Sequence, residues 1–178
     1  MLSLERIKEA KINVKTYLRN GLLKKKEYNE NIFQAYMEKS NESLEVTNYL
    51  SENHMSSMWI TVTSYYSMYY ISNAVLYKMG YKVGDEISHK VTCDALIDLV
   101  RDKLKNNLIE EFEDAQDEAF QITNSEKADN IIESLDYERR KRSKFQYEMT
   151  AEIKDSRAKT SFERAKIFNL EMNKILIN

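Results

Sequence analysis

Residues that shape sheets and disulfide-bonded folds are scarce in this chain of 178 residues. It has no proline, three glycines and one cysteine, Cys93. Sheets and their turns normally use more proline and glycine, so their scarcity favours an all-α fold. A single cysteine excludes an internal disulfide and fits a reducing compartment, which makes the cytoplasm the expected location.

A strong excess of one charge is also missing, because the net charge at pH 7 is -2. The whole chain therefore does not attract nucleic acid, and any binding to RNA or DNA must come from a local patch. The first residues, MLSLERIKEAK, are charged from Glu5 and lack the apolar core of a signal peptide. The length fits one domain that covers residues 1–178.

One long stretch without charge, MSSMWITVTSYYSMYYISNAVLY, runs from Met55 to Tyr77, although charged residues make up 31% of the chain. Apolar and aromatic side chains would fall on every side of a helix here, Trp59 included. Such a helix is typically buried. Lys78 and Gly80 are typical of a helix C-terminus. We therefore expect this stretch to be the central helix of a bundle.

A membrane span is the alternative for this stretch, because about 20 residues cross a bilayer. Six polar residues oppose it, and the chain has no second hydrophobic segment, so no membrane association is expected. These residues are Thr61, Thr63, Ser64, Ser67, Ser72 and Asn73. The small residues Ser64, Ser67 and Ala74 instead suit the close approach of neighbouring helices.

Apolar residues at helical spacing predict helices on both sides of the central one. A loop at 80–86 and a break at 122–125 separate some of them, with Ser88 as an expected N-cap. The predicted helices cover about 4–20, 27–52, 88–104, 107–120, 126–147 and 150–177. The fold expected is an up-and-down bundle of four or five long helices plus short ones.

The two histidines do not form a metal site by their spacing. His54 lies in a turn and His89 in a first helical turn, and no second histidine or cysteine stands at metal-ligand spacing from either. His89 is either structural or a ligand or base. The acidic residues within 107–120 are more typical of a solvated helix face than of a cation site. No metal and no cofactor are expected.

Basic residues gather in one place. They are Arg139, Arg140, Lys141, Arg142 and Lys144. Arg142 continues an apolar helical stripe with Leu135, Phe145 and Met149, so it needs a structural partner or is directed at a phosphate group. A shorter run, Lys24–Lys26, is expected to be a solvated helix end, with an anion contact as the alternative.

The order of several motifs resembles the HEPN domain superfamily, in particular its small stand-alone prokaryotic members. The resemblance is strongest over 57–178. The motifs are Ser64–Tyr70, Asn73–Tyr81, Ser88–Lys90, Arg142–Tyr147 and Phe162–Ala165. The resemblance implies a helical bundle that usually dimerises. It also implies a metal-independent ribonuclease, or a partner for a minimal nucleotidyltransferase in a toxin–antitoxin pair.

The catalytic motif of the family's ribonucleases is an arginine followed after four to six residues by a histidine. Here Arg142 matches the arginine, and Tyr147 stands where the histidine would be, an arrangement that some members share. Arg142 and Tyr147 are the candidate catalytic residues. Tyrosine, with a pKa of about 10, is a poor base near neutral pH, so the two fit phosphate binding better than catalysis. Enzymatic activity stays open.

Three functions follow as hypotheses. The first is a nucleotide- or RNA-binding, regulatory component of a two-component system, with Arg139, Arg140, Lys141, Arg142 and Lys144 on phosphates. The second is a metal-independent endoribonuclease with a non-standard site, in which Tyr147 or His89 transfers the proton. The third is a structural dimer that binds a nucleotidyltransferase. A homodimer is expected because tyrosine is enriched at interfaces.

Overall fold

The computed structural model describes residues 2–104, 107–135 and 143–177, with side chains described outside 124–154. Its elements are α1 (Leu4–Asn20), β1 (Leu23–Lys25), α2 (Glu30–Glu52), α3 (Ser57–Lys78), β2 (Tyr81–Val83), α4 (Ser88–Leu99), a 3-10 turn (Arg101–Lys103), α5 (Leu108–Leu135) and α6 (Ser143–Ile177). The described chain is mostly helical, as the shortage of proline and glycine predicts.

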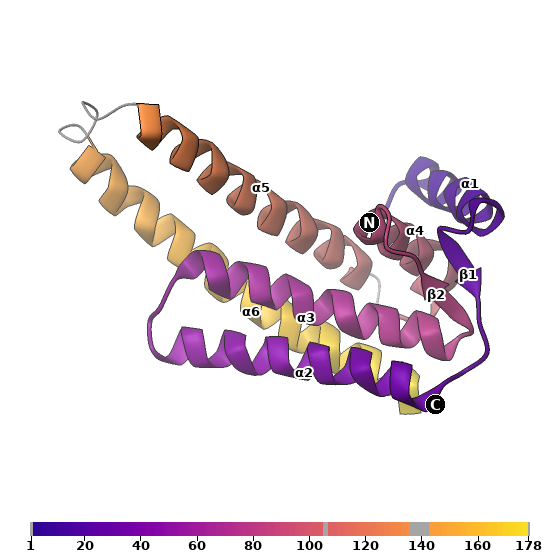
Figure 1. Cartoon of the computed structure of the whole chain (residues 1–178). Coiled ribbons are helices and arrows are strands. Elements are labelled where there is room, and N and C mark those ends of the chain that lie inside the picture. The colour runs from indigo at the N-terminus through magenta and orange to yellow at the C-terminus, as the bar shows by residue number, and fades with distance from the viewer. Residues whose placement is uncertain (1, 105–106, 136–142, 178) are drawn as a thin grey trace.

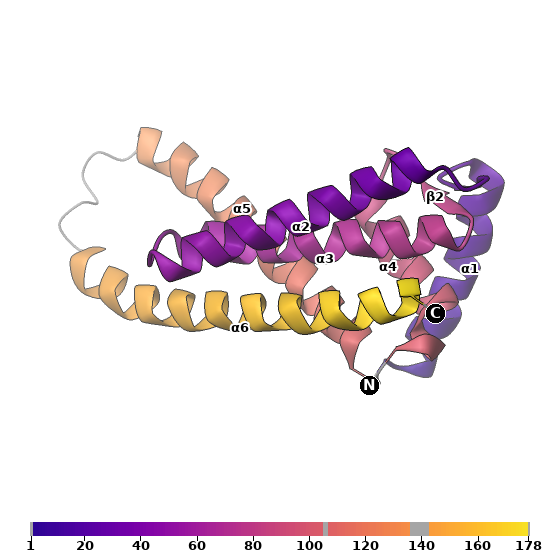
Figure 2. The same ribbon diagram turned by 90° about the horizontal axis from the view of Figure 1, so that it is seen from below.

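The long helices α2, α3, α5 and α6 alternate in direction (Figures 1 and 2). α3 and α6 run the same way, because Ser57 Oγ donates to Asp155 at one end and Lys78 Nζ donates to the carbonyl of Leu176 at the other. α1 and α4 lie together beside the end of α3, next to the two strands. The bundle therefore follows the up-and-down order that the sequence predicts.

The central position of α3 is confirmed by the burial of its middle and last turns. Its residues from Ile71 to Tyr77 are all buried. The prediction was wrong at the first turn, where the side chain of Trp59 is 53% exposed. The reason is that α3 lies among neighbours along most of its length but projects one side of its first turns to solvent.

Small polar residues let three helices approach closely, as expected for Ser64 and Ser67. The hydroxyl of Ser40 on α2 donates a hydrogen bond to the carbonyl of Ser67 at 2.8 Å. Asn169 of α6 donates from Nδ2 to Ser67 Oγ at 3.1 Å, and its Oδ1 lies 2.9 Å from Ser40 Oγ. Ser40, Ser67 and Asn169 are buried, so this junction joins α2, α3 and α6 through satisfied polar groups.

A two-stranded antiparallel ribbon is the element that the sequence did not predict. β1 pairs with β2 so that Leu23 faces Val83, Lys24 faces Lys82 and Lys25 faces Tyr81. Lys24–Lys26 is exposed as expected, but Lys24 and Lys25 belong to β1 and not to a helix end. The loop expected at 80–86 contains β2 in its middle. The strands form because the chain leaving α3 returns beside the connection from α1 to α2, which no local pattern reveals.

Helix ends agree with the prediction where glycine sets them. α1 ends at Asn20, and Gly21 adopts a φ of 74°, a left-handed conformation that glycine adopts readily. Gly80, with a φ of 88°, follows α3 and turns the chain into β2. Both residues stand where the sequence placed the ends of these helices.

Other boundaries differ from the prediction. α2 begins at Glu30 instead of near residue 27, and Asn29 caps it by accepting from the N–H of Ile32 at 3.3 Å. Ser88 is the first residue of α4 and Ile87 takes the N-cap position. The break expected at 122–125 is absent, because Thr123 donates back to the carbonyl of Ala119 within a continuous α5. α6 begins at Ser143, before the expected residue 150.

Candidate functional site

The basic residues that the sequence predicts to form a site lie in a part of the chain whose side chains are not described. Arg139, Arg140, Lys141 and Arg142 lie outside the described residues. Lys144 and Tyr147 lie in the first turns of α6, where only the backbone is described. Their roles as phosphate-binding or catalytic residues stay predictions.

The ribbon brings four lysines together on the described surface. Lys24, Lys25 and Lys26 are exposed, and Lys82 stands directly opposite Lys24. Leu23 and Val83 are buried on one face of the ribbon, so Lys24 and Lys82 share the opposite, outer face. None of these four ammonium groups has an ion pair with a carboxylate among the described side chains. We call Lys24, Lys25, Lys26 and Lys82 the basic ribbon.

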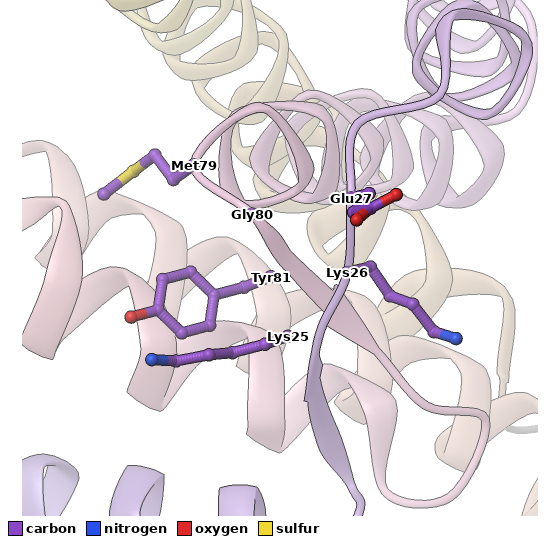
Figure 3. Close-up of a pocket in the computed structure, with 6 residues that line it drawn as sticks. All are labelled: Lys25, Lys26, Glu27, Met79, Gly80 and Tyr81. Atoms are coloured by element: carbon purple, nitrogen blue, oxygen red, sulfur yellow. The ribbon is translucent and has the colours of Figure 1, made fainter.

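A shallow hollow of about 430 Å³ lies beside the basic ribbon (Figure 3). Figure 3 shows the side chain of Lys25 lying alongside the ring of Tyr81, with Lys26 pointing to the other side of its strand. The Lys26 N–H donates to the carbonyl of Gly80 at 2.9 Å and extends the pairing of the two strands. The hollow thus combines two cations, the carboxylate of Glu27 and one aromatic ring on a backbone held by hydrogen bonds.

A second group of interest is an aromatic patch on α3 and α4, which consists of Tyr66, Tyr69, Tyr70 and His89. Their rings are half-buried, and Tyr69 lies 4.4 Å from His89 between centroids. Tyr66 is 5.9 Å from His89 and 5.9 Å from Tyr70. The hydroxyls of the three tyrosines have no hydrogen-bond partner among the described residues, so they are available to a ligand or to water.

Tyr65 lies under this patch and orients His89. Its ring is completely buried, and its hydroxyl lies 2.6 Å from Nδ1 of His89. Burial lowers the pKa of His89, so the imidazole is neutral at neutral pH. Burial also raises the pKa of Tyr65, so its phenol keeps its proton.

The position of the imidazole proton follows from this contact. Within the described part of the chain, Nδ1 of His89 is the one acceptor for the Tyr65 phenol, and a buried hydroxyl is costly without an acceptor. The phenol therefore donates to Nδ1, and the imidazole proton lies on Nε2. His89 then presents an N–H donor at the surface instead of a free lone pair.

A group of three further rings lies near the end of the basic ribbon. Tyr28 follows β1 by three residues, and its ring lies 6.2 Å from that of Tyr77, which is 6.1 Å from that of Tyr36. Burial raises the pKa of Tyr36, and the nearby phenols of Tyr69 and Tyr77 raise it further. Tyr77 is buried and Tyr36 is half-buried, so Tyr28 and Tyr36 are the rings of this group that a ligand can reach.

A third cluster is structural. Arg6 of α1 lies 2.7 Å from Asp94 of α4 and 2.9 Å from Glu113 of α5. Asp94 is completely buried and also accepts from the hydroxyl of Tyr17 at 2.8 Å. Cys93 is buried beside this cluster, and burial raises the pKa of its thiol. A solvent-borne ligand does not reach Asp94, so the cluster joins helices.

The described residues form no group of three or more histidine, cysteine or acidic side chains that could hold a metal ion. No helix among them is long and apolar enough to cross a membrane. Fold and site together define an all-α helical protein with a basic two-stranded ribbon. No protein-family model, no curated protein and no solved structure matches the chain.

Sequence reasoning missed the role of Lys82 and the ribbon that holds it. A weak signal was present, because Gly80 and Gly84 bracket the short segment Tyr81–Val83, which is rich in strand-forming residues. It also missed that Tyr66, Tyr69 and Tyr70 stay half-buried. No local signal separates these rings from the buried Tyr65 next to them.

Proposed function

We propose that this protein binds RNA or a nucleotide as the helical, regulatory component of a two-component system of the HEPN type. Its partner in this proposal is a minimal nucleotidyltransferase, and the chain acts as a homodimer in the cytoplasm. The observation that carries the binding proposal is the pair of lysines, Lys24 and Lys82, that face each other across the ribbon. The HEPN motifs in the sequence supply the two-component part.

Like charges directly opposite each other on a ribbon are unfavourable, by about 0.2–1 kcal/mol relative to neutral pairs. Lys25 and Lys26 increase the local positive charge, and no described carboxylate forms an ion pair with any of the four. A phosphate group between the lysines would turn this repulsion into two favourable contacts. The four lysines therefore destabilise the free ribbon slightly and favour the binding of an anion. The phosphates of RNA or a nucleotide are anions of that kind.

The ribonuclease alternative receives less support from the described residues. Metal-free cleavage of RNA needs a group that takes the proton from the 2′-hydroxyl. His89 has the right kind of side chain, but its hydrogen bond with Tyr65 leaves a donor on Nε2 and no free lone pair. Arg142 and Tyr147 lack a good base between them. Binding is thus the function that the chemistry favours.

The binding proposal is tested with a fluorescent single-stranded RNA by anisotropy over a series of salt concentrations. The variant is Lys24→Gln with Lys82→Gln, and the matched control is Lys103→Gln with Lys159→Gln, two exposed lysines outside the ribbon. Each lost phosphate contact reduces the slope of log K against log salt by about 0.7, so the ribbon variant is expected to lose about 1.4. An unchanged slope in the ribbon variant would refute the proposal.

The nuclease alternative is decided separately. Purified protein is mixed with total cellular RNA in EDTA, with Arg142→Ala alongside. Intact RNA in both samples is the expected result. Discrete cleavage that disappears in the variant would establish a metal-independent nuclease that works without the usual histidine.

A further inference from the structure

We infer that the aromatic patch of Tyr66, Tyr69, Tyr70 and His89 is a stacking surface for the bases of single-stranded RNA whose phosphates lie along the basic ribbon. This inference rests on the proposed function and adds the class of ligand. It separates two tasks, which are phosphate binding by Lys24, Lys25, Lys26 and Lys82 and base binding by the rings.

The rings of the patch differ from an ordinary core in their access to solvent. Tyr65, one residue from Tyr66, is completely buried and packs against Phe112 and Phe120 of α5 at centroid distances of 5.7 Å and 5.8 Å. Tyr66, Tyr69 and Tyr70 are only half-buried, and their hydroxyls find no partner among the described residues. Rings fixed on a rigid helix and still open on one side are what base stacking requires.

Neighbouring contacts hold the patch in place before any ligand arrives. His89 is held by its hydrogen bond to Tyr65 and lies 4.4 Å from the Tyr69 ring, with 34° between the two planes. Phe120 of α5 lies edge-on to His89 at 5.1 Å. Because these side chains are already ordered, a base that stacks on them costs little further side-chain entropy.

The aromatic patch and the basic ribbon differ in the charges around them. The patch has mixed neighbours, since Lys39 lies 5.5 Å from the centre of the Tyr70 ring, and the pKa of Tyr70 is raised by burial first and by the nearby phenols and the charge of Glu42 as well. The ribbon has four lysines and no ion-paired carboxylate among the described side chains. Phosphates are therefore attracted to the ribbon, whereas the patch suits an uncharged, planar group such as a base.

Two accessible tyrosines, Tyr28 and Tyr36, add aromatic surface near the end of the ribbon. Tyr28 is 50% exposed beside the end of β1 and Tyr36 is half-buried on α2, and both rings pack against the buried Tyr77, at 6.2 Å and 6.1 Å between centroids. The Nε2–H of His89 is a donor for a ring nitrogen or a carbonyl oxygen of a base. A duplex hides its bases from such rings, so the ligand is single-stranded.

The first experiment uses the unaltered protein. A labelled oligoadenylate is compared with an abasic strand of the same length and charge, and with the same oligoadenylate in a duplex. Binding to oligoadenylate is expected to be at least about fivefold tighter than to either, because each stacked base contributes about 1–3 kcal/mol. Equal binding of the abasic strand would overturn the stacking inference.

Variants then locate the effect. Tyr69→Leu removes a ring of the patch and is expected to abolish most of the preference for bases, whereas Tyr69→Phe retains it. Tyr49→Leu is the matched control, because Tyr49 of α2 is 61% exposed and has no ring contact with the patch. Far-UV circular dichroism checks that each variant is folded, and a folded Tyr69→Leu that keeps the full preference would refute the assignment to this patch.

The outcomes separate this inference from the proposed function. If the abasic strand binds as well as oligoadenylate and the ribbon variant still weakens both, the stacking inference fails and phosphate binding stands. If no strand binds at low salt, both fail. If Lys24→Gln with Lys82→Gln binds both strands as tightly as the unaltered protein and keeps the preference for bases, the patch is supported and phosphate binding by the ribbon is refuted.

Discussion

Arg6 is the residue that couples the first helix to the rest of the bundle. Its guanidinium contacts carboxylates from two different helices, Asp94 on α4 and Glu113 on α5. Asp94 has no exposure to solvent, and the hydroxyl of Tyr17 and the amide of Asn13 provide its remaining hydrogen bonds. Both of these donors bond to Oδ2, so Oδ1 of the buried carboxylate depends on its ion pair with Arg6 at 2.7 Å.

We predict that Arg6→Met destabilises the protein by about 3 kcal/mol, because a buried carboxylate then loses its counter-charge. The measurement is the free energy of unfolding in urea. Arg19→Met is the control, since Arg19 is exposed in the last turn of the same helix. A loss no larger than that of the control would mean that Tyr17 and Asn13 alone satisfy Asp94.

The lowered pKa of His89 makes the free energy of unfolding depend on pH. Burial lowers its pKa below the ordinary value of about 6.5, so below that pH the unfolded chain takes up a proton that the folded chain does not. The stability from the neutral imidazole is therefore complete above about pH 6.5 and is lost as the pH falls through the lower, folded pKa. Stability should fall on acidification across this window.

The test compares urea unfolding at about pH 7.5 and about pH 5.5. The drop in stability is expected to be smaller in His89→Gln than in the unaltered protein. His54→Gln, at an exposed position in the turn before α3, is expected to keep the full drop. An equal drop in His89→Gln and the unaltered protein would contradict the assignment to His89.

The junction of α2, α3 and α6 illustrates what decides packing at the level of whole elements. A stripe of small residues indicated that other helices approach α3 closely, and burial of Ser64 and Ser67 confirms it. The sequence did not indicate which helices these are. Asn169, far along the chain, completes the hydrogen bonds of Ser40 and Ser67, and its identity as a partner depends on how α6 lies.

We predict that Asn169→Ala lowers the free energy of unfolding by about 1–3 kcal/mol, because Ser67 Oγ loses a buried partner and a small space is left. Asn173→Ala, one turn later on α6, is the control, since within the described residues its amide donates to the carbonyl of Asn169 alone. Urea unfolding measures both. Equal losses would show that the contacts between helices contribute nothing beyond those within α6.

The ribbon and the helix boundaries show which features a local sequence pattern can predict and which it cannot. The ends of α1 and α3 were predictable because Gly21 and Gly80 adopt left-handed conformations at them. The strands were not, since three residues paired with three others are too short for any periodicity to reveal. The continuous α5 was missed because its polar residues resembled a break, although Thr123 simply bonds back within the helix.

At the scale of the whole molecule, exposed apolar side chains on α6 bear on the expected homodimer. Ile167 and Leu170 are 50% and 59% exposed on the outer side of this helix. A hollow of about 530 Å³ lies between α2 and α6, with Leu44, Tyr49 and Phe162 in its lining. A second copy of the chain would cover these surfaces and remove them from water.

We predict that the protein has twice the 21.1 kDa mass of one chain in solution, measured by light scattering after size-exclusion chromatography. Ile167→Glu with Leu170→Glu is expected to give the monomer, because each charge would be buried in the interface. Thr160→Glu, at an exposed polar position on the same helix, is the control. If the unaltered protein has the mass of a monomer, the dimer prediction is wrong. If the double variant has the mass of a dimer, the interface lies on another face.

The sequence by itself determined the helical class and the buried central helix. Both depend on the shortage of proline and glycine and on the uncharged stretch before Lys78, which act locally along the chain. It also marked Arg142 and its basic neighbours, whose side chains lie outside the described residues. Within the described residues, only the tertiary structure decided the pairing of Lys24 with Lys82 and of Tyr65 with His89. These contacts join residues on different elements, and their formation depends on how the helices pack.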